Sequence, residues 1–278
     1  MTLLLKVVAV VAVMYATIVA LVFWFQPKLV YFPMKGPYTV TPQSRGLPFE
    51  RVRVPTEDGE QLAAWWVPAA RSEPKLGGGT VLLFHGNAGN ISHRIDYAKM
   101  FYALGYNTLL VDYRGFGEST GEPSEQGTYR DALASWQWLT ATQGVQAADI
   151  VIFGESLGGG IATWLAARQV PRALILASTF TSIADLGAQV YPWVPVHWIS
   201  RIHYNNLGNL DKIRTPLLVA HSPADELIPY THGRRLYEAA QVPKTFLQLS
   251  GGHNEGFVFA RDEWVKAVQA FLQRHARK

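Results

Sequence analysis

The chain has 278 residues, of which 49% are hydrophobic and 17% are charged, and its formal net charge is +4. These values suit one globular domain with an additional apolar segment, and the scattered basic residues argue against nucleic acid as a partner. The chain contains no cysteine, which excludes disulfides, a thiol nucleophile and cysteine-ligated metal. No His-Glu-x-x-His pattern supports a zinc hydrolase, so we expect neither a metal nor another cofactor.

The amino-terminal stretch is apolar. Residues 7–25 carry no charge, and about 19 helical residues span roughly the hydrocarbon thickness of a bilayer. Trp24 and Phe25 lie where an aromatic belt is expected. A cleaved signal peptide is the alternative, but it has a shorter apolar core and small residues before its cleavage site. We therefore expect residues 1–25 to form a single-pass anchor in the lipid bilayer, with its orientation open because lysines lie near both ends.

Residues 26–48 contain five prolines and two glycines, which predicts an extended tether between the membrane and a domain over 49–278. The domain begins with two candidate strands, at 49–54 and 61–67. They are joined through Asp58-Gly59, a dipeptide typical of a β-hairpin turn.

From Thr80 onward, short apolar runs alternate with helix-favouring stretches. This alternation predicts an α/β domain with a mostly parallel central sheet and helices on both faces. The expected strands are 81–84, 108–111, 150–153, 173–176, 217–220 and 245–249, and the expected helices are about 92–104, 124–142, 161–168 and 255–274.

The third strand of this series leads into Gly154-Glu155-Ser156-Leu157-Gly158. A strand, a Gly-x-Ser-x-Gly turn and a helix form the context of a nucleophile elbow. Glycine at 154 and 158 removes Cβ atoms that would clash across such a turn. An ordinary capping serine in a glycine-rich turn is the alternative, and the rest of the chain must decide between the two.

A serine hydroxyl needs an imidazole to take its proton and a carboxylate to fix that imidazole's tautomer. Asp225 and His253 each follow a buried strand, where ligands bind in open parallel sheets. Glu226 and His221 are the nearest rivals, but they fit the strand ends less well. Asp225 could instead cap a helix, and His253 could be a turn residue. The order Ser156, Asp225, His253 nevertheless predicts a catalytic triad.

The oxyanion of an acyl-transfer reaction needs hydrogen-bond donors. We expect one from the backbone N–H of Leu157 and the other from the backbone N–H of Asn87, in the turn His85-Gly86-Asn87. Asp112 and Arg114 follow another strand end. We expect them to form a structural charge pair rather than to act in catalysis.

An irregular insertion at about residues 181–211, here called the lid segment, interrupts the alternation between the fourth and fifth of these strands. It is longer than an ordinary connection, and it contains Tyr191, Trp193 and Trp198. Local packing of a loop is one interpretation. Because aromatic faces give large apolar contacts, the other is that the segment covers the site and binds substrate.

The motifs His85-Gly86-Asn87-Ala88-Gly89-Asn90, Gly154-Glu155-Ser156-Leu157-Gly158-Gly159 and the downstream Ser178-Thr179-Phe180-Thr181-Ser182, together with Asp225 and His253, resemble those of the α/β-hydrolase superfamily. More narrowly, they resemble a membrane-anchored branch that includes eukaryotic protein depalmitoylases and uncharacterised bacterial members. The resemblance covers about residues 49–275. It implies the α/β-hydrolase fold and a serine-hydrolase activity.

The expected function is therefore a membrane-anchored serine hydrolase that cleaves an ester or thioester of an apolar acyl group through an acyl-enzyme on Ser156. Its partners would be the bilayer and a small or acylated substrate, and the sequence leaves its oligomeric state open. A serine peptidase of the prolyl-peptidase type is one alternative. A non-catalytic binding protein on the same fold is another, although such a protein would have no chemical need for all three triad residues.

Overall fold

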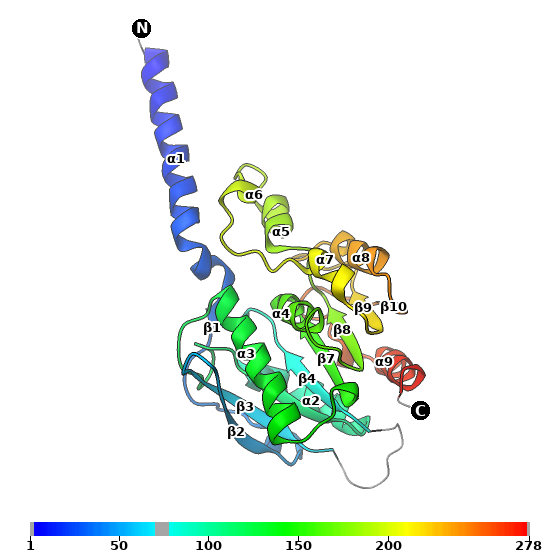
Figure 1. Cartoon of the computed structure of the whole chain (residues 1–278). Helices are drawn as coiled ribbons and strands as arrows, with labels where there is room; N and C mark the ends of the chain where they lie inside the picture. The colour runs from blue at the N-terminus through cyan, green and yellow to red at the C-terminus, as the bar shows by residue number, and fades with distance from the viewer. Residues whose placement is uncertain (1–2, 70–77, 277–278) are drawn as a thin grey trace.

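A computed structural model describes residues 3–69 and 78–276. The first two residues of the expected anchor and the last two of the expected domain therefore lie outside the described part. Figure 1 shows a long amino-terminal helix, α1 (Leu3–Val30), that projects away from an α/β domain. Among the described residues, α1 is the one helix long and apolar enough to cross a bilayer.

The centre of the domain is an eight-stranded sheet with the order β10-β9-β8-β7-β4-β6-β3-β2. The β2–β3 hairpin and the β3–β6 pair are antiparallel, and the other neighbours are parallel. The prediction of a mostly parallel sheet is thus confirmed. The strands are β2 (Glu50–Pro55), β3 (Gln61–Val67), β4 (Thr80–Phe84), β6 (Asn107–Val111), β7 (Ile150–Glu155), β8 (Ala173–Ala177), β9 (Leu217–His221) and β10 (Lys244–Gln248).

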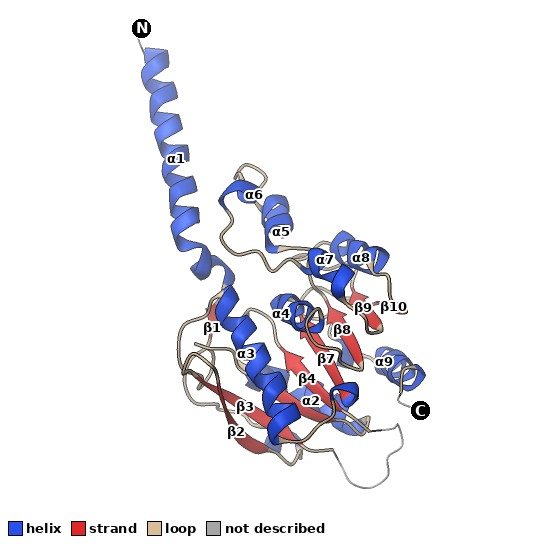
Figure 2. Ribbon diagram, viewed as in Figure 1, coloured by secondary structure: helices blue, strands red, loops and turns tan. Residues whose placement is uncertain are grey.

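Helices cover both faces of this sheet, as predicted (Figure 2). Successive strand residues point to opposite faces, so Leu82 and Ile152 join one buried cluster with α3, α4 and α8, while Val81 and Val151 join another with α2 and α9. The helices are α2 (Ile95–Ala103), α3 (Glu125–Gln137), α4 (Leu157–Ala166), α5 (Ile183–Val190), α6 (Val196–Ile199), α7 (Asn206–Asn209), α8 (Tyr230–Ala239) and α9 (Asp262–Arg274).

All four predicted helices have different boundaries in the structure; α2 and α4 differ by four residues or fewer at either end, and the other two differ more at one end. Ser124 caps α3 by accepting a hydrogen bond from the Gly127 N–H at 3.1 Å. The predicted helix continues beyond α3 as a π-helix, Trp138–Thr142. The closing helix begins at Asp262 rather than near residue 255. The preceding stretch is glycine-rich and forms turns instead, in which the N–H groups of Glu255 and Gly256 both donate to the Gly252 carbonyl.

The predicted extended tether at 26–48 differs from the structure in two respects. First, α1 continues through Pro27 to Val30. Second, the following chain is extended but docked: β1 (Phe32–Pro33) pairs in parallel with β5 (Ala88–Gly89). The Phe32 N–H donates to the Asn87 carbonyl at 2.9 Å. The base of α1 is therefore fixed beside the turn that follows β4, because backbone hydrogen bonds join the two.

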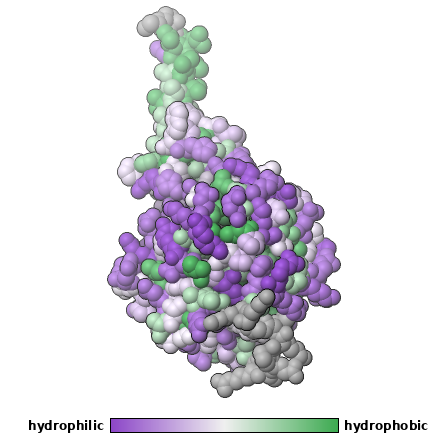
Figure 3. Space-filling model, turned by 45° about the vertical axis from the view of Figure 1, so that its right-hand side comes forward, coloured by the Kyte–Doolittle hydropathy of each residue, from purple (hydrophilic) through white to green (hydrophobic). Residues whose placement is uncertain are grey.

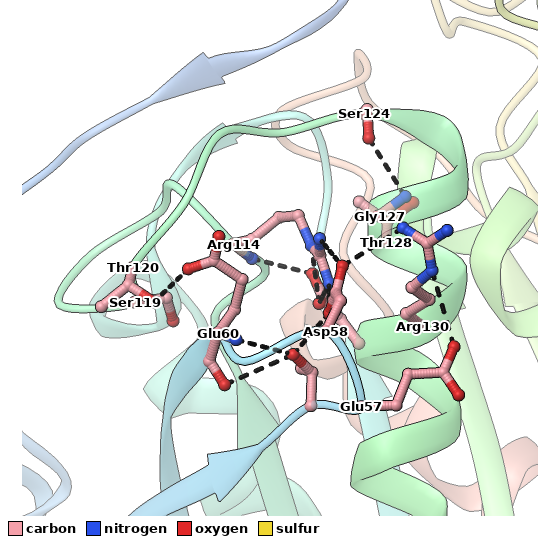
Figure 4. A network of polar contacts seen from close by, with 12 residues as sticks. Glu57, Asp58, Glu60, Arg114, Ser119, Thr120, Ser124, Gly127, Thr128 and Arg130 are labelled. Atoms are coloured by element: carbon pink, nitrogen blue, oxygen red, sulfur yellow. Dashed lines mark hydrogen bonds and ion pairs between the residues drawn. The ribbon is translucent and has the colours of Figure 1, made fainter.

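Arg114 and Asp112 do not form the expected charge pair. Arg114 is buried, and it donates to Asp58 Oδ2 at 2.7 Å (Figure 4). It also donates to Asp131 Oδ1 at 2.9 Å. Asp112 instead accepts from the Ile91 N–H at 2.9 Å and from the Tyr38 hydroxyl. Each buried charge thus has its own partner from a distant part of the chain, and Arg114 joins the β2–β3 turn to α3.

Candidate active site

Ser156 lies at the sharp turn between β7 and α4. Its backbone has φ 52° and ψ −118°, a conformation that costs a non-glycine residue free energy unless the surroundings hold it. Two hydrogen bonds with residues at and just after the end of β8 hold this conformation. The Ser156 N–H donates to the Ala177 carbonyl at 2.9 Å, and the Thr179 hydroxyl donates to the Ser156 carbonyl at 2.7 Å.

The glycines on either side of Ser156 are required by close backbone approach. A Cβ on Gly154 would lie 2.5 Å from the Gly158 carbonyl oxygen, and a Cβ on Gly158 would lie 2.1 Å from the Phe84 carbonyl oxygen. Both contacts are with backbone atoms, which cannot rotate away. The expectation that these glycines allow the turn is confirmed, and they let the first turn of α4 pack directly on β4.

Asp225 and His253 converge on Ser156 from the ends of β9 and β10. His253 Nε2 lies 3.1 Å from Ser156 Oγ, and His253 Nδ1 lies 2.8 Å from Asp225 Oδ2. The other carboxylate oxygen, Oδ1, accepts from the backbone N–H groups of Leu227 at 3.0 Å and Ile228 at 2.8 Å. The structure therefore brings the three predicted side chains together, with the carboxylate fixed by the backbone.

Burial alone would raise the pKa of Asp225. Hydrogen bonds from His221 and His253 outweigh this effect and hold the pKa below its usual range. An ionised Asp225 keeps the proton of neutral His253 on Nδ1, which leaves Nε2 as an acceptor for the Ser156 hydroxyl.

His221 and Glu226, the alternatives considered from the sequence, lie next to Asp225 and His253. His221 Nε2 is 2.8 Å from the Ile228 carbonyl and 3.4 Å from Asp225 Oδ2. Glu226 accepts the backbone N–H of His253 at 2.9 Å. Both therefore support the loops that carry Asp225 and His253, and neither occupies the position between the imidazole and the serine.

The two residues expected to supply the oxyanion donors follow β7 and β4 in the chain. Leu157 is the first residue of α4, so its N–H has no acceptor within the helix. Asn87 lies in the turn after β4, where its side-chain amide donates to the Val30 carbonyl at 3.0 Å. Both residues line the same cavity as Ser156 and His253. The hydrogen bond from the Asn87 side chain to the Val30 carbonyl also ties the turn after β4 to the base of α1.

The cavity above Ser156 has a volume of about 270 Å³ and mainly apolar walls. Besides the lid segment, one wall is the carboxyl-terminal part of α1, which the sequence analysis did not assign to the site. A hint of this role is Gln26, an amide that directly follows the apolar run. The lining residues are Val22, Gln26, Leu29, Val30, Asn87, Ser156, Leu157, Phe180, Ile183, Leu186, Gly187, Val190, Tyr191, Val196, Ile199, Ser200, Ile202, Leu227, Ile228 and His253.

Of the three aromatic residues predicted to bind substrate, one lines the cavity and the other two lie outside its described lining. Tyr191 lines the cavity, whereas Trp193 and Trp198 are not among its described lining residues. Trp198 is 91% exposed, and Trp193, 53% exposed, contacts the Tyr191 ring edge-on with ring centroids 6.4 Å apart. Both tryptophans face outward, and Ile183 and Leu186 of α5, in the same lid segment, form the wall instead.

His232 connects α8 to the lid segment, and its burial predicts that the fold is sensitive to acid. Its Nδ1 accepts the Thr181 N–H at 3.1 Å, and its Nε2 lies 3.2 Å from Gln189 Oε1. Burial lowers the pKa of His232 to about 4, with Asp185 opposing and Arg235 reinforcing the shift. Since the unfolded chain binds this proton more tightly, the stabilisation is lost as pH falls from about 6.5 towards 4.

We therefore expect urea unfolding to separate wild type from His232→Asn in acid. Between pH 7 and pH 4.5, wild type should lose about 1–3 kcal/mol more stability than the variant, because asparagine has no such proton to bind. The measurement is the free energy of unfolding of both proteins at the two pH values. Equal losses would show that His232 is not the titrating group.

Comparisons with known proteins agree with this fold. The family model described as alpha/beta hydrolase fold matches residues 79–197. The uncharacterised protein Rv2307c of Mycobacterium tuberculosis is 38% identical over 274 residues, which cover 98% of this chain and 96% of the relative. The alpha/beta hydrolase domain-containing protein WAV2 of Arabidopsis thaliana is 32% identical over 282 residues, which cover 93% and 91% respectively.

Two further proteins carry names that state an activity. The lysophosphatidylserine lipase ABHD12 of Macaca fascicularis is 32% identical over 238 residues, which cover 75% of this chain and 58% of the lipase. The esterase Pf2001 of Pyrococcus furiosus superposes with a TM-score of 0.71 at 20% identity, covering 89% of this chain and 98% of the esterase. At that identity the second likeness concerns the fold alone. With the sheet order, the serine turn and these relatives in agreement, the chain belongs to the alpha/beta hydrolase family.

Proposed function

We propose that this chain is a membrane-anchored serine hydrolase that cleaves an ester or thioester of an apolar acyl group through an acyl-enzyme on Ser156. The observation that carries the proposal is the chain of contacts from Ser156 Oγ through His253 to Asp225, which opens into an apolar cavity. Relatives named as a lipase and an esterase support the same reaction class.

In the acylation step, Ser156 Oγ bonds to the carbonyl carbon while its proton passes to His253 Nε2. Asp225 stabilises the imidazolium that forms. The carbonyl electron pair moves to the oxygen, which accepts hydrogen bonds from the backbone N–H groups of Leu157 and Asn87. The intermediate then collapses, the bond to the alcohol or thiol breaks, and the proton on Nε2 goes to that leaving group.

In the deacylation step, a water molecule takes the place of the leaving group. His253 Nε2 accepts a proton from this water as its oxygen bonds to the acyl carbon. The second tetrahedral intermediate breaks the bond to Ser156 Oγ, which recovers the proton from Nε2. The balance is one ester or thioester and one water consumed, and one carboxylic acid and one alcohol or thiol released.

The cavity lining favours an apolar acyl group over a peptide. Among the described residues that line it, none is an aspartate, glutamate, lysine or arginine. A peptidase that recognises a charged chain terminus needs such a group to pair with it. The hydrocarbon of an acyl chain needs only apolar contact, to which each buried methylene contributes about 0.8 kcal/mol.

The test combines a covalent probe with a substrate panel. We expect a fluorophosphonate to label full-length protein on Ser156, as read by peptide mass spectrometry. Octanoyl esters should exceed acetyl esters in kcat/KM by about tenfold or more, since several methylenes are buried. Faster turnover of aminoacyl amides than of esters would support the peptidase alternative. Absence of labelling and of turnover would support a non-catalytic binding protein.

A further inference from the structure

One face of α1 contacts the lid segment along much of the helix. Among the described residues of α1, those not exposed are Val19, Val22, Phe23, Gln26 and Val30. Their spacings are three or four residues, apart from the adjacent pair Val22 and Phe23, and this pattern places them on a single helix face. Val22, Gln26 and Val30 reach the cavity of Ser156, so this face extends from the middle of α1 to the candidate active site.

Polar side chains on α1 bind the backbone of the lid segment. The Tyr15 hydroxyl donates to the Trp193 carbonyl at 2.8 Å. Gln26 donates to the Ile199 carbonyl at 2.7 Å and accepts from the Arg201 N–H at 2.7 Å. These contacts join positions more than 170 residues apart in the sequence. The lid segment is therefore held against a helix whose base is docked on the domain and whose amino-terminal part projects away from it (Figure 1).

The position of Tyr15 determines how deep the lid segment lies if α1 crosses a bilayer. A membrane span needs about 20 residues, and α1 comprises the 28 residues Leu3–Val30. Possible spans of that length run from 3–22 to 11–30, and all of them contain residues 11–22. Tyr15, and with it Trp193, lies within the membrane in every case.

The lid contacts suit such an environment. Irregular backbone is tolerated at membrane depth only where its polar groups find partners in the protein. The Trp193 carbonyl has the Tyr15 hydroxyl, and the Val194 N–H donates to the Tyr191 carbonyl at 2.9 Å. Outward-facing Trp193 and Trp198 match the aromatic side chains that favour the membrane interface. Figure 3 shows α1 as an apolar projection above a largely polar domain surface.

A second apolar hollow continues the cavity along α1. It lies between Tyr15, Val19 and Phe23 of α1 and Pro195 and Ile199 of the lid segment. Ile199 lines both this hollow and the cavity of Ser156. The seam between α1 and the lid segment is thus lined mainly by apolar side chains from the hollow down to the serine, and Gln26 is a polar side chain within it.

We propose that lid residues 191–199 insert into the bilayer beside α1, and that the seam between them admits the substrate laterally from the membrane. The substrate class is then a single-chain acyl ester that resides in the bilayer. The reaction itself rests on the proposed function. A single chain fits because the cavity holds about 270 Å³, just below the usual range for small-molecule pockets. The anchor thereby forms one wall of the substrate path.

Insertion is tested with a depth-sensitive label on the full-length protein in phosphatidylcholine vesicles. The chain has no cysteine, so Trp193→Cys and Val170→Cys each provide one labelling site. Val170 is a control because it is 65% exposed and precedes β8, at the sheet edge opposite Ser156. Spin-labelled lipids should quench a fluorophore at 193 at least several-fold more than one at 170. Equal, weak quenching at both positions would overturn insertion.

Lateral entry is tested by Trp193→Glu, with Trp193→Phe as the matched control. A charge at this depth opposes insertion. The Glu variant should lose about tenfold or more of the turnover of a monoacylglycerol in vesicles. It should keep turnover of a water-soluble butyryl ester within about twofold, and the Phe variant should resemble wild type on both substrates.

Equal loss of both substrates, or loss of neither, would overturn lateral entry. If wild type shows no labelling of Ser156 by the fluorophosphonate and no ester turnover, the proposed function fails instead. The depth measurement does not depend on catalysis, so it still decides whether the lid residues are inserted.

Discussion

Replacing Ser156 by alanine is expected to abolish fluorophosphonate labelling and to lower kcat/KM for esters on the order of 10⁴-fold or more. The variant removes the atom that lies 3.1 Å from His253 Nε2 but keeps the Cβ. Alanine therefore adopts the same backbone conformation, φ 52°, at a similar cost, and the fold should persist. The measurement is ester turnover together with the circular dichroism spectrum and the urea midpoint.

Ser178→Ala is the matched control for this experiment. Ser178 is also buried and also has a positive φ, of 48°, but it is absent from the described cavity lining. Its replacement should change kcat/KM only a few-fold. If Ser156→Ala retained more than about a tenth of wild-type activity, Ser156 would not be the nucleophile, because serine hydrolases without it keep only residual catalysis.

Asp225→Asn is expected to lower kcat/KM by about 10³- to 10⁴-fold. An asparagine can present its NH₂ group to His253 Nδ1, which favours the tautomer with the proton on Nε2. That tautomer cannot accept the Ser156 proton. The variant retains an oxygen for the N–H groups of Leu227 and Ile228, so the loop after β9 should keep its shape. The measurement is kcat/KM for a short, water-soluble ester.

The adjacent carboxylate supplies the comparison. Glu226→Gln still offers an oxygen to the backbone N–H of His253, so we expect a loss of no more than about tenfold. A larger loss from Glu226→Gln than from Asp225→Asn would reverse the assignment of the carboxylate that orients the imidazole. Both substitutions remove one negative charge. They differ in that Asp225 contacts the His253 ring, whereas Glu226 contacts the His253 backbone.

The sequence by itself determined the local architecture around Ser156. Apolar runs of four or five residues predict the buried strands, and the glycines at 154 and 158 predict the tight turn between strand and helix. These features depend on the sterics of neighbouring residues. The structure accordingly shows a Cβ at either glycine meeting backbone atoms at 2.5 Å or less. The position of Asp225 and His253 after strands also follows from the sequence, because the ends of parallel strands meet at one sheet edge.

Only the tertiary structure decided which distant groups meet. Asp112 and Arg114 are neighbours in sequence, yet Arg114 binds Asp58 and Asp131, because it is buried where those carboxylates converge. Hydrophobicity marked Trp193 and Trp198 as candidates for the acyl pocket, but it gives no direction, and both face outward.

The role of α1 is the largest feature that the sequence left open. Its apolar composition indicated a membrane anchor, and the prolines after it indicated an extended tether. Hydrogen bonds from Gln26 to Ile199 and from Phe32 to Asn87 instead dock its base on the domain, and Val22 and Val30 line the cavity. An apolar helix can face lipid or protein with similar composition. Packing between segments far apart in the chain decides which face of the helix meets protein and which face is left for lipid.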